Sequence, residues 1–156
     1  MEIAKLGTLG VWTWLDHLGA KEVVAFAQRL ETWGYRALWI PEAVGRDPFA
    51  LIGFLAANTD KLVFATGIAN IYARDPMTMR AIRETLGDLS NGRFVLGLGV
   101  SHAPMVTGLR KHEYGWAVVA SASRMARSRA GDSRSRRPIT EIRTPSLAQR
   151  AASLIR

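Results

Sequence analysis

The amino-acid sequence predicts an α/β protein built on a parallel β-sheet. Short apolar runs typical of strands alternate along the chain with longer segments whose apolar residues recur at helical spacing. The apolar runs are suited to burial on both faces, as the strands of parallel sheets are. Two of the helical segments begin with an Asp-Pro pair, which supplies a side-chain cap and a first-turn proline. These observations indicate right-handed β-α-β units that share one sheet.

The first two strands and the helix between them come early in the chain. Leu6–Trp12 is an apolar run with small residues and is expected to be a buried strand. Lys21–Trp33 changes to helical spacing, with an apolar face opposite a charged one. Gly34 follows as the stop signal of this helix. Ala37–Ile40 is the expected second strand, and Pro41 ends it.

Two further helix and strand pairs follow. Asp47-Pro48 opens the second helix, and Lys61–Thr66, rich in β-branched and aromatic residues, is the third strand. Asp75-Pro76 opens the third helix and Asn91-Gly92 closes it before the fourth strand, Phe94–Leu98. One face of the third helix is apolar at spacings of three and four residues: Met79, Ile82, Leu86 and Leu89. The alternation fits both a doubly wound sheet and a partial (β/α)8 barrel, and periodicity alone leaves both open.

Composition excludes several classes of function. The 156 residues have the length of one domain, and the absence of cysteine excludes disulfides, thiolate nucleophiles and cysteine metal sites. The histidines have no metal-ligand spacing, so no metal is expected. No apolar run has the length of a membrane span, and the N-terminus has no secretory signal pattern. The expected location is therefore the cytoplasm, with no membrane partner.

The composition changes after Gly115, which divides the chain into residues 1–115 and residues 116–156. The first part holds twelve Lys and Arg against eleven Asp and Glu, whereas the second holds nine Arg and two acidic residues. Ala, Ser and Arg supply 24 of these last 41 residues, and the alternation of strands and helices stops. We expect a mostly disordered basic tail with helical propensity over residues 117–129 and 146–156.

Three origins of the tail stay open. The favoured one is a frameshift or a truncated gene, because an Ala, Ser and Arg-rich segment without Lys is typical of GC-rich DNA read in a shifted frame. A second is a genuine Arg/Ser-rich segment that binds nucleic acid through its phosphates. A third is an appendage to a half-barrel that pairs with another chain. Under the favoured origin, nucleic acid would bind only nonspecifically and with strong salt dependence.

Several motifs of residues 1–115 agree in order and spacing with one enzyme family. They are GVWTW, EVVAFAQRLETWGYRALWIPE, DPFALIGFLAANTDKLVFATGI, ATGIANIYARDP and TLGDLSNGRFVLGLGVSH. Together they resemble the luciferase-like monooxygenase family, and within it the deazaflavin-dependent oxidoreductases that use coenzyme F420. The resemblance implies a TIM-like (β/α)8 barrel, of which this chain would supply the N-terminal half with about four parallel strands.

The same resemblance implies an oxidoreductase that transfers hydride between coenzyme F420 and a small organic substrate, with FMN as the alternative cofactor. A half-barrel would have little activity of its own, and it would lack the phosphate site that barrels place after their last two strands. Its unpaired strand edges predict a homodimer or an aggregate. The rival function is a noncatalytic remnant or a nucleic-acid-binding fragment that acts through the basic tail.

The resemblance places the cofactor ring against a bulge after the third strand, often held by a non-prolyl cis peptide. The matching positions are Gly67, Ile68, Ala69 and Asn70. Glycine lets the backbone approach a flat ring closely, and backbone amides there can hydrogen-bond its polar edge. The alternative is an ordinary glycine between a strand and a loop.

The candidate catalytic residues follow the second and fourth strands. Glu42 could orient the substrate or hold a proton, or it could be a solvated loop acid. His102, next to Ser101, could donate a hydrogen bond or carry a proton, or it could be a solvated loop histidine. Trp12 and Thr13 end the first strand, where an aromatic wall for the ring or substrate belongs, although packing in the core or at the rim is the favoured explanation of Trp12.

Overall fold

The computed structural model describes residues 6–115. The predicted tail, with its helices over residues 117–129 and 146–156, lies outside them. The elements follow in the order β1 (Gly10–Trp12), α1 (Ala20–Thr32), β2 (Ala37–Ile40), α2 (Pro48–Ala56), β3 (Val63–Thr66), β4 (Ala69–Asn70), α3 (Pro76–Leu89), β5 (Phe94–Val95), β6 (Leu98–Gly99) and the π-helical segment η2 (Pro104–Leu109). The alternation expected from the sequence is confirmed.

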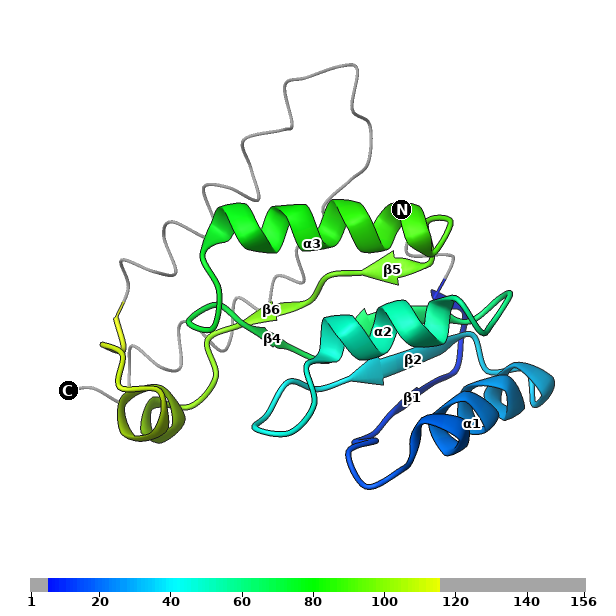
Figure 1. The fold of residues 1–156 in the computed structure, drawn as a ribbon, viewed down its shortest axis with the longest axis horizontal. Coiled ribbons are helices and arrows are strands. Elements are labelled where there is room, and N and C mark those ends of the chain that lie inside the picture. The colour runs from blue at the N-terminus through cyan, green and yellow to red at the C-terminus, as the bar shows by residue number, and fades with distance from the viewer. Residues whose placement is uncertain (1–5, 116–156) are drawn as a thin grey trace, which may run out of the picture.

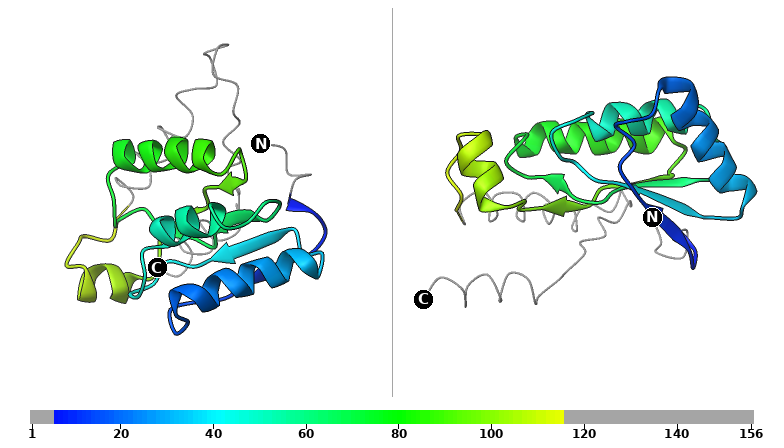
Figure 2. Two further views of the ribbon diagram at one scale, coloured as in Figure 1. Left: turned by 45° about the vertical axis from the view of Figure 1, so that its right-hand side comes forward. Right: turned by 90° about the horizontal axis from the view of Figure 1, so that it is seen from below.

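The strands form a parallel sheet in the order β1-β2-β3-β5, and a short parallel pair, β4-β6, extends it. The chain adds the strands of the four-stranded sheet in order from one edge to the other, while β4 lies between β3 and β5 in sequence and pairs with β6. The three α-helices cover one face of this sheet (Figures 1 and 2). A doubly wound sheet carries helices on both faces, whereas a barrel carries them all outside. The described residues thus form an arc of a (β/α) barrel.

The two Asp-Pro helix starts are confirmed in atomic detail. The Asp47 carboxylate accepts the first free amides of α2, from Phe49 and Ala50, at 2.9 Å each. Asp75 caps α3 in the same way, through the amides of Met77 and Thr78. Among residues 6–115, no helix has the length and apolar character that crossing a membrane requires.

The core lies between the sheet and its helices. The predicted stripe of α3 is buried at Met79 and Leu86 and partly buried at Ile82, but Leu89, the last residue of the helix, is 65% exposed, which corrects that part of the prediction. The rings of Phe49 and Phe94 meet edge to face at 6.3 Å. The most deeply buried side chains of this layer are Val23, Ala27, Leu30, Leu38, Ile52, Leu55, Leu62 and Phe64. This packing holds the helix starts close to the strand ends, where the candidate site lies.

Two strands begin later than expected, for different reasons. The first begins at Gly10 and not at Leu6, because Gly7 takes a positive φ of 67° that breaks the extended chain. The third begins at Val63 and not at Lys61. The Glu31 carboxylate accepts the amides of Lys61 and Leu62 at 2.5 and 2.6 Å, so these residues do not join the ladder.

Candidate functional site

The chain bulges between β3 and β4, over Gly67 and Ile68. The Gly67 amide donates to the Ile40 carbonyl at 2.8 Å, but the next bond of the ladder, from the Glu42 amide at 3.3 Å, ends on the carbonyl of Ile68. In a regular parallel ladder both bonds would involve the same residue. One residue is therefore inserted here, which is the geometry of a β-bulge.

The neighbouring strand breaks at the same level, which corrects the prediction of one continuous strand over Phe94–Leu98. The buried Thr66 hydroxyl accepts the Gly97 amide at 2.7 Å and donates to the Gly97 carbonyl at 2.8 Å. The same carbonyl accepts the Ala69 amide at 2.7 Å. A side chain thus replaces one rung of the ladder, and the strand continues separately as β6.

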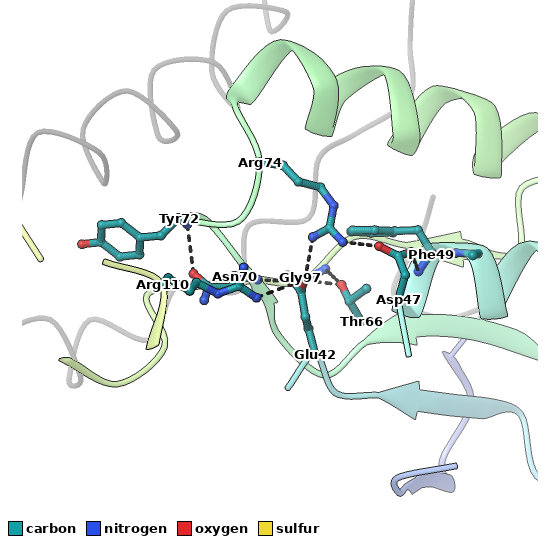
Figure 3. A network of polar contacts seen from close by, with 10 residues as sticks. Glu42, Asp47, Phe49, Thr66, Asn70, Tyr72, Arg74, Gly97 and Arg110 are labelled. Carbon is teal, nitrogen blue, oxygen red and sulfur yellow. Dashed lines mark hydrogen bonds and ion pairs between the residues drawn. The ribbon is translucent and has the colours of Figure 1, made fainter. Parts of the chain in front are cut away.

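Glu42, after β2, lies at the centre of a polar network (Figure 3). Its side chain is only 6% exposed, so it is not a solvated loop acid. Oε2 accepts the Asn70 amide at 2.7 Å, and Oε1 accepts Nη1 of Arg74 at 2.6 Å. Both oxygens of the carboxylate are therefore engaged by other parts of the chain.

Arg74 joins Glu42 to the start of α2. One guanidinium nitrogen donates to Glu42 and the other donates to Asp47, while the guanidinium lies 4.6 Å from the centre of the Phe49 ring. Burial alone would lower the pKa of Arg74, but the two carboxylates raise it. Burial alone would raise the pKa of Asp47, but the amide of Ala50 and the guanidinium of Arg74 hold it below the ordinary value. Both shifts favour the charged forms of Asp47 and Arg74.

Arg110 approaches the same carboxylate from the end of η2. Its Nη2 atom lies 4.0 Å from Oε1 of Glu42, and its buried Nε–H has no hydrogen-bond acceptor among the described residues. Asn70 is almost fully buried beside it, and its side-chain oxygen accepts the Tyr72 amide at 2.9 Å. The network thus connects segments that follow β2, β4 and β6.

The side chains of Trp12 and Ile68 pack closely against Gly67 and Gly99, which have no Cβ atom. A Cβ atom on Gly67 would lie 2.5 Å from Nε1 of Trp12, so the edge of the Trp12 indole lies directly against this backbone. A Cβ on Gly99 would lie 2.8 Å from the Ile68 side chain. Trp12 is nevertheless 53% exposed and Ile68 44% exposed, so both offer apolar surface at the carboxyl ends of the strands.

The cis peptide expected at the bulge is not present. Every peptide bond among residues 6–115 is trans. The bulge instead leaves one amide free: no described residue accepts the Ile68 N–H, whereas the amides of Gly67, Ala69 and Asn70 all have acceptors. The residue that carries this unpaired N–H, Ile68, is 44% exposed.

His102, Ser101 and Thr13 stand apart from this network. The His102 side chain is exposed and makes no hydrogen bond with any described residue, while its carbonyl accepts amides at the start of η2. Ser101 takes a positive φ of 57°, and its hydroxyl lies 3.6 Å from the sulfur of Met105. Thr13 bonds locally, to the carbonyl of Trp14 at 3.3 Å. The structure brings together Glu42 and Asn70, but not His102.

The sequence alone assigns no role to Arg74, Arg110 or Thr66, and it identifies Asp47 only as a helix cap. The signal in the sequence that points to Arg74 is its position, since it is a charged residue that follows the third strand and directly precedes Asp75-Pro76. Its partners are 32 and 27 residues away along the chain, which periodicity cannot reveal.

A sheet with helices on one face and its polar network at the carboxyl ends of the strands defines part of a (β/α) barrel of the enzyme type. The family model of the luciferase-like monooxygenases matches residues 3–129, and the chain belongs to that family. The match continues past Gly115 into the segment that composition assigns to the tail.

The relatives include a protein of Mycobacterium tuberculosis with the provisional name of a coenzyme F420-dependent oxidoreductase. It is 33% identical over 105 residues, which are 67% of this chain and 29% of the relative. The 5,10-methylenetetrahydromethanopterin reductase of Methanolobus tindarius is 30% identical over 79 residues, which are 50% of this chain and 24% of the relative. The matched segments span less than a third of these curated relatives.

Solved structures agree with the fold. The coenzyme F420 dependent tetrahydromethanopterin reductase from Methanopyrus kandleri is similar with a TM-score of 0.60 at 21% identity, over 66% of this chain and 30% of that one. The oxygenating constituent of 3,6-diketocamphane monooxygenase from Pseudomonas putida, solved with FMN, has a TM-score of 0.58 at 17% identity. That match covers 68% of this chain and 32% of the other. The proteins similar to this chain thus include ones named for coenzyme F420 and one solved with FMN.

Proposed function

We propose that residues 6–115 contain the ring-binding part of an oxidoreductase site that takes coenzyme F420 or FMN, with an organic substrate. The observation that carries this proposal is the free Ile68 amide, which lies at the exposed turn of a bulge whose neighbouring amides have acceptors among the described residues. A flavin or deazaflavin ring presents carbonyl and nitrogen acceptors along one edge, and this N–H suits such an edge.

The surrounding residues fit a flat ring. Trp12 lies against Gly67, and Ile68 follows Gly67 in the chain; both side chains expose apolar surface. The indole edge against Gly67 makes Trp12 the wall of the site, while the backbone of the bulge supplies the polar contact. When bound, the cofactor would supply hydride transfer, and these residues would orient its ring and exclude water.

The two candidate catalytic residues take different roles in this proposal. Glu42 is buried and bound by Asn70 and Arg74, which suits a positioning role better than proton transfer. The exposed His102 side chain has no partner among the described residues and is available to carry a proton. The proposal therefore assigns orientation to Glu42 and proton transfer to His102.

Ring-only ligands test the proposal most directly. Deazariboflavin and riboflavin carry the ring without phosphate, so their fluorescence titration reports this site alone. We expect binding weaker than micromolar, and a loss of affinity of roughly threefold to tenfold in Trp12→Ala. Trp33→Ala is the matched control, because Trp33 is 62% exposed and its ring lies beside Arg29 at the end of α1.

Two outcomes of these titrations would contradict the proposal. Equal effects of Trp12→Ala and Trp33→Ala, or no binding of either ring at millimolar concentration, would refute the placement of the ring. Comparing the two ligands, and then coenzyme F420 with FMN, would distinguish a deazaflavin site from a flavin site.

A further inference from the structure

The acceptor of the Asn70 amide is not the one that a regular parallel sheet would supply. After the bulge, the next acceptor on the β2 side should be the backbone carbonyl of Glu42. The amide donates instead to the side chain of Glu42, at 2.7 Å from Oε2. The carboxylate therefore replaces a backbone acceptor directly after the bulge.

The orientation of Glu42 depends in turn on Arg74. The guanidinium engages Oε1 at 2.6 Å, and its other end is held by Asp47 and by the face of the Phe49 ring. Asp47 is itself fixed as the cap of α2. A continuous series of contacts thus leads from the start of α2 through Arg74 and Glu42 to the bulge.

We propose that Arg74 is a positioning residue: through Glu42 it sets the conformation of the Gly67–Asn70 bulge and thereby the affinity for the cofactor ring. The part concerning affinity rests on the proposed function, and the part concerning the bulge does not. Arg110 acts on the same carboxylate more weakly, because its nearest nitrogen is 4.0 Å away.

Amide hydrogen exchange in the complete 156-residue chain tests the structural part. In Arg74→Gln, the Asn70 amide should exchange about tenfold faster or more, relative to the amide of Phe64 in β3. Arg110→Gln should have a smaller effect. The control is Arg80→Gln, which removes an ion-paired arginine from the exposed face of α3, where Arg80 binds Glu84 at 3.2 Å.

Deazariboflavin titration of the same variants tests the affinity part. Arg74→Gln should weaken binding about tenfold, Arg74→Lys should restore part of the loss, and Arg80→Gln should match the unaltered chain. If Arg74→Gln fails to fold, the affinity of Arg74→Lys compared with that of the unaltered chain still tests the role of Arg74.

The outcomes separate the two proposals. Faster exchange at Asn70 with unchanged ring affinity would leave Arg74 a merely structural residue and overturn the inference. Unchanged exchange at Asn70 would overturn it as well. If the unaltered chain binds no ring, the proposed function fails, and faster exchange at Asn70 would still support control of the bulge by Arg74.

Discussion

The substitution Gly97→Ala is expected to destabilise the chain by about 2–6 kcal/mol. A Cβ atom at this position would lie 2.5 Å from the carbonyl oxygen of Thr66, whereas ordinary contact begins at 3.4 Å. The obstacle is the backbone carbonyl at the end of β3, so no side-chain rotation relieves it. The two strands must separate by several tenths of an ångström.

Two contributions make up this magnitude. Overpacking of a buried position costs about 1–3 kcal/mol. Separation of the strands also weakens the bonds at 2.7 and 2.8 Å between Gly97 and the Thr66 hydroxyl, each worth about 0.5–1.5 kcal/mol. Both contributions act in the same direction, because the methyl group and the hydrogen bonds compete for the same space.

Urea unfolding of the 156-residue chain, followed by circular dichroism, measures the effect. Gly108→Ala is the matched control: Gly108 lies in η2, and nothing lies within 4 Å of its added Cβ. This control should change stability by no more than about 1 kcal/mol, and in the stabilising direction. Equal unfolding midpoints for Gly97→Ala and the unaltered chain would refute the tight contact between Thr66 and Gly97.

Two further predictions concern the same region. Thr66→Val should lower the stability of the chain by about 1–3 kcal/mol, because the buried Gly97 amide loses its acceptor. Thr66→Ser keeps the hydroxyl and should recover most of this stability. Equal urea midpoints for the valine and serine variants would contradict this prediction. Asp47→Asn tests the lowered pKa of Asp47. The stabilisation from this carboxylate is present above pH 3.8 and is lost as the pH falls below it, so the stability gap to the unaltered chain should close in acid. A gap independent of pH would exclude that titration.

The parts of the fold that the sequence predicts are those fixed by local chemistry. Asp47 and Asp75 cap helices through amides two and three residues away, so the pattern carries the whole interaction. The strand positions follow from short apolar runs. A barrel could be chosen over a doubly wound sheet only from the family resemblance. The spacing of apolar residues in a helix does not tell on which side of the sheet the helix lies.

The parts that it does not predict depend on distant contacts. Phe94–Leu98 has the pattern of one strand, and it breaks because Thr66, 31 residues earlier, binds Gly97. Glu42 could be selected from its place after a strand, but its burial depends on Arg74, which is 32 residues further on. Such pairs have no period, so only the folded chain shows them.

The bulge itself explains why a ligand contact is expected at Ile68 and not elsewhere. Interrupting a ladder deprives several amides of their backbone acceptors, and side chains replace two of them: the Glu42 carboxylate for Asn70, and the Asn70 side-chain oxygen for Tyr72. From Gly67 to Ala73, only the Ile68 amide lacks an acceptor among the described residues. An unpaired amide is tolerated where water or a ligand reaches it, and Ile68 is 44% exposed. The bulge thus accounts for both features, the buried Glu42 carboxylate that accepts the Asn70 amide and the unpaired amide of Ile68. A change that straightens the bulge should therefore remove both.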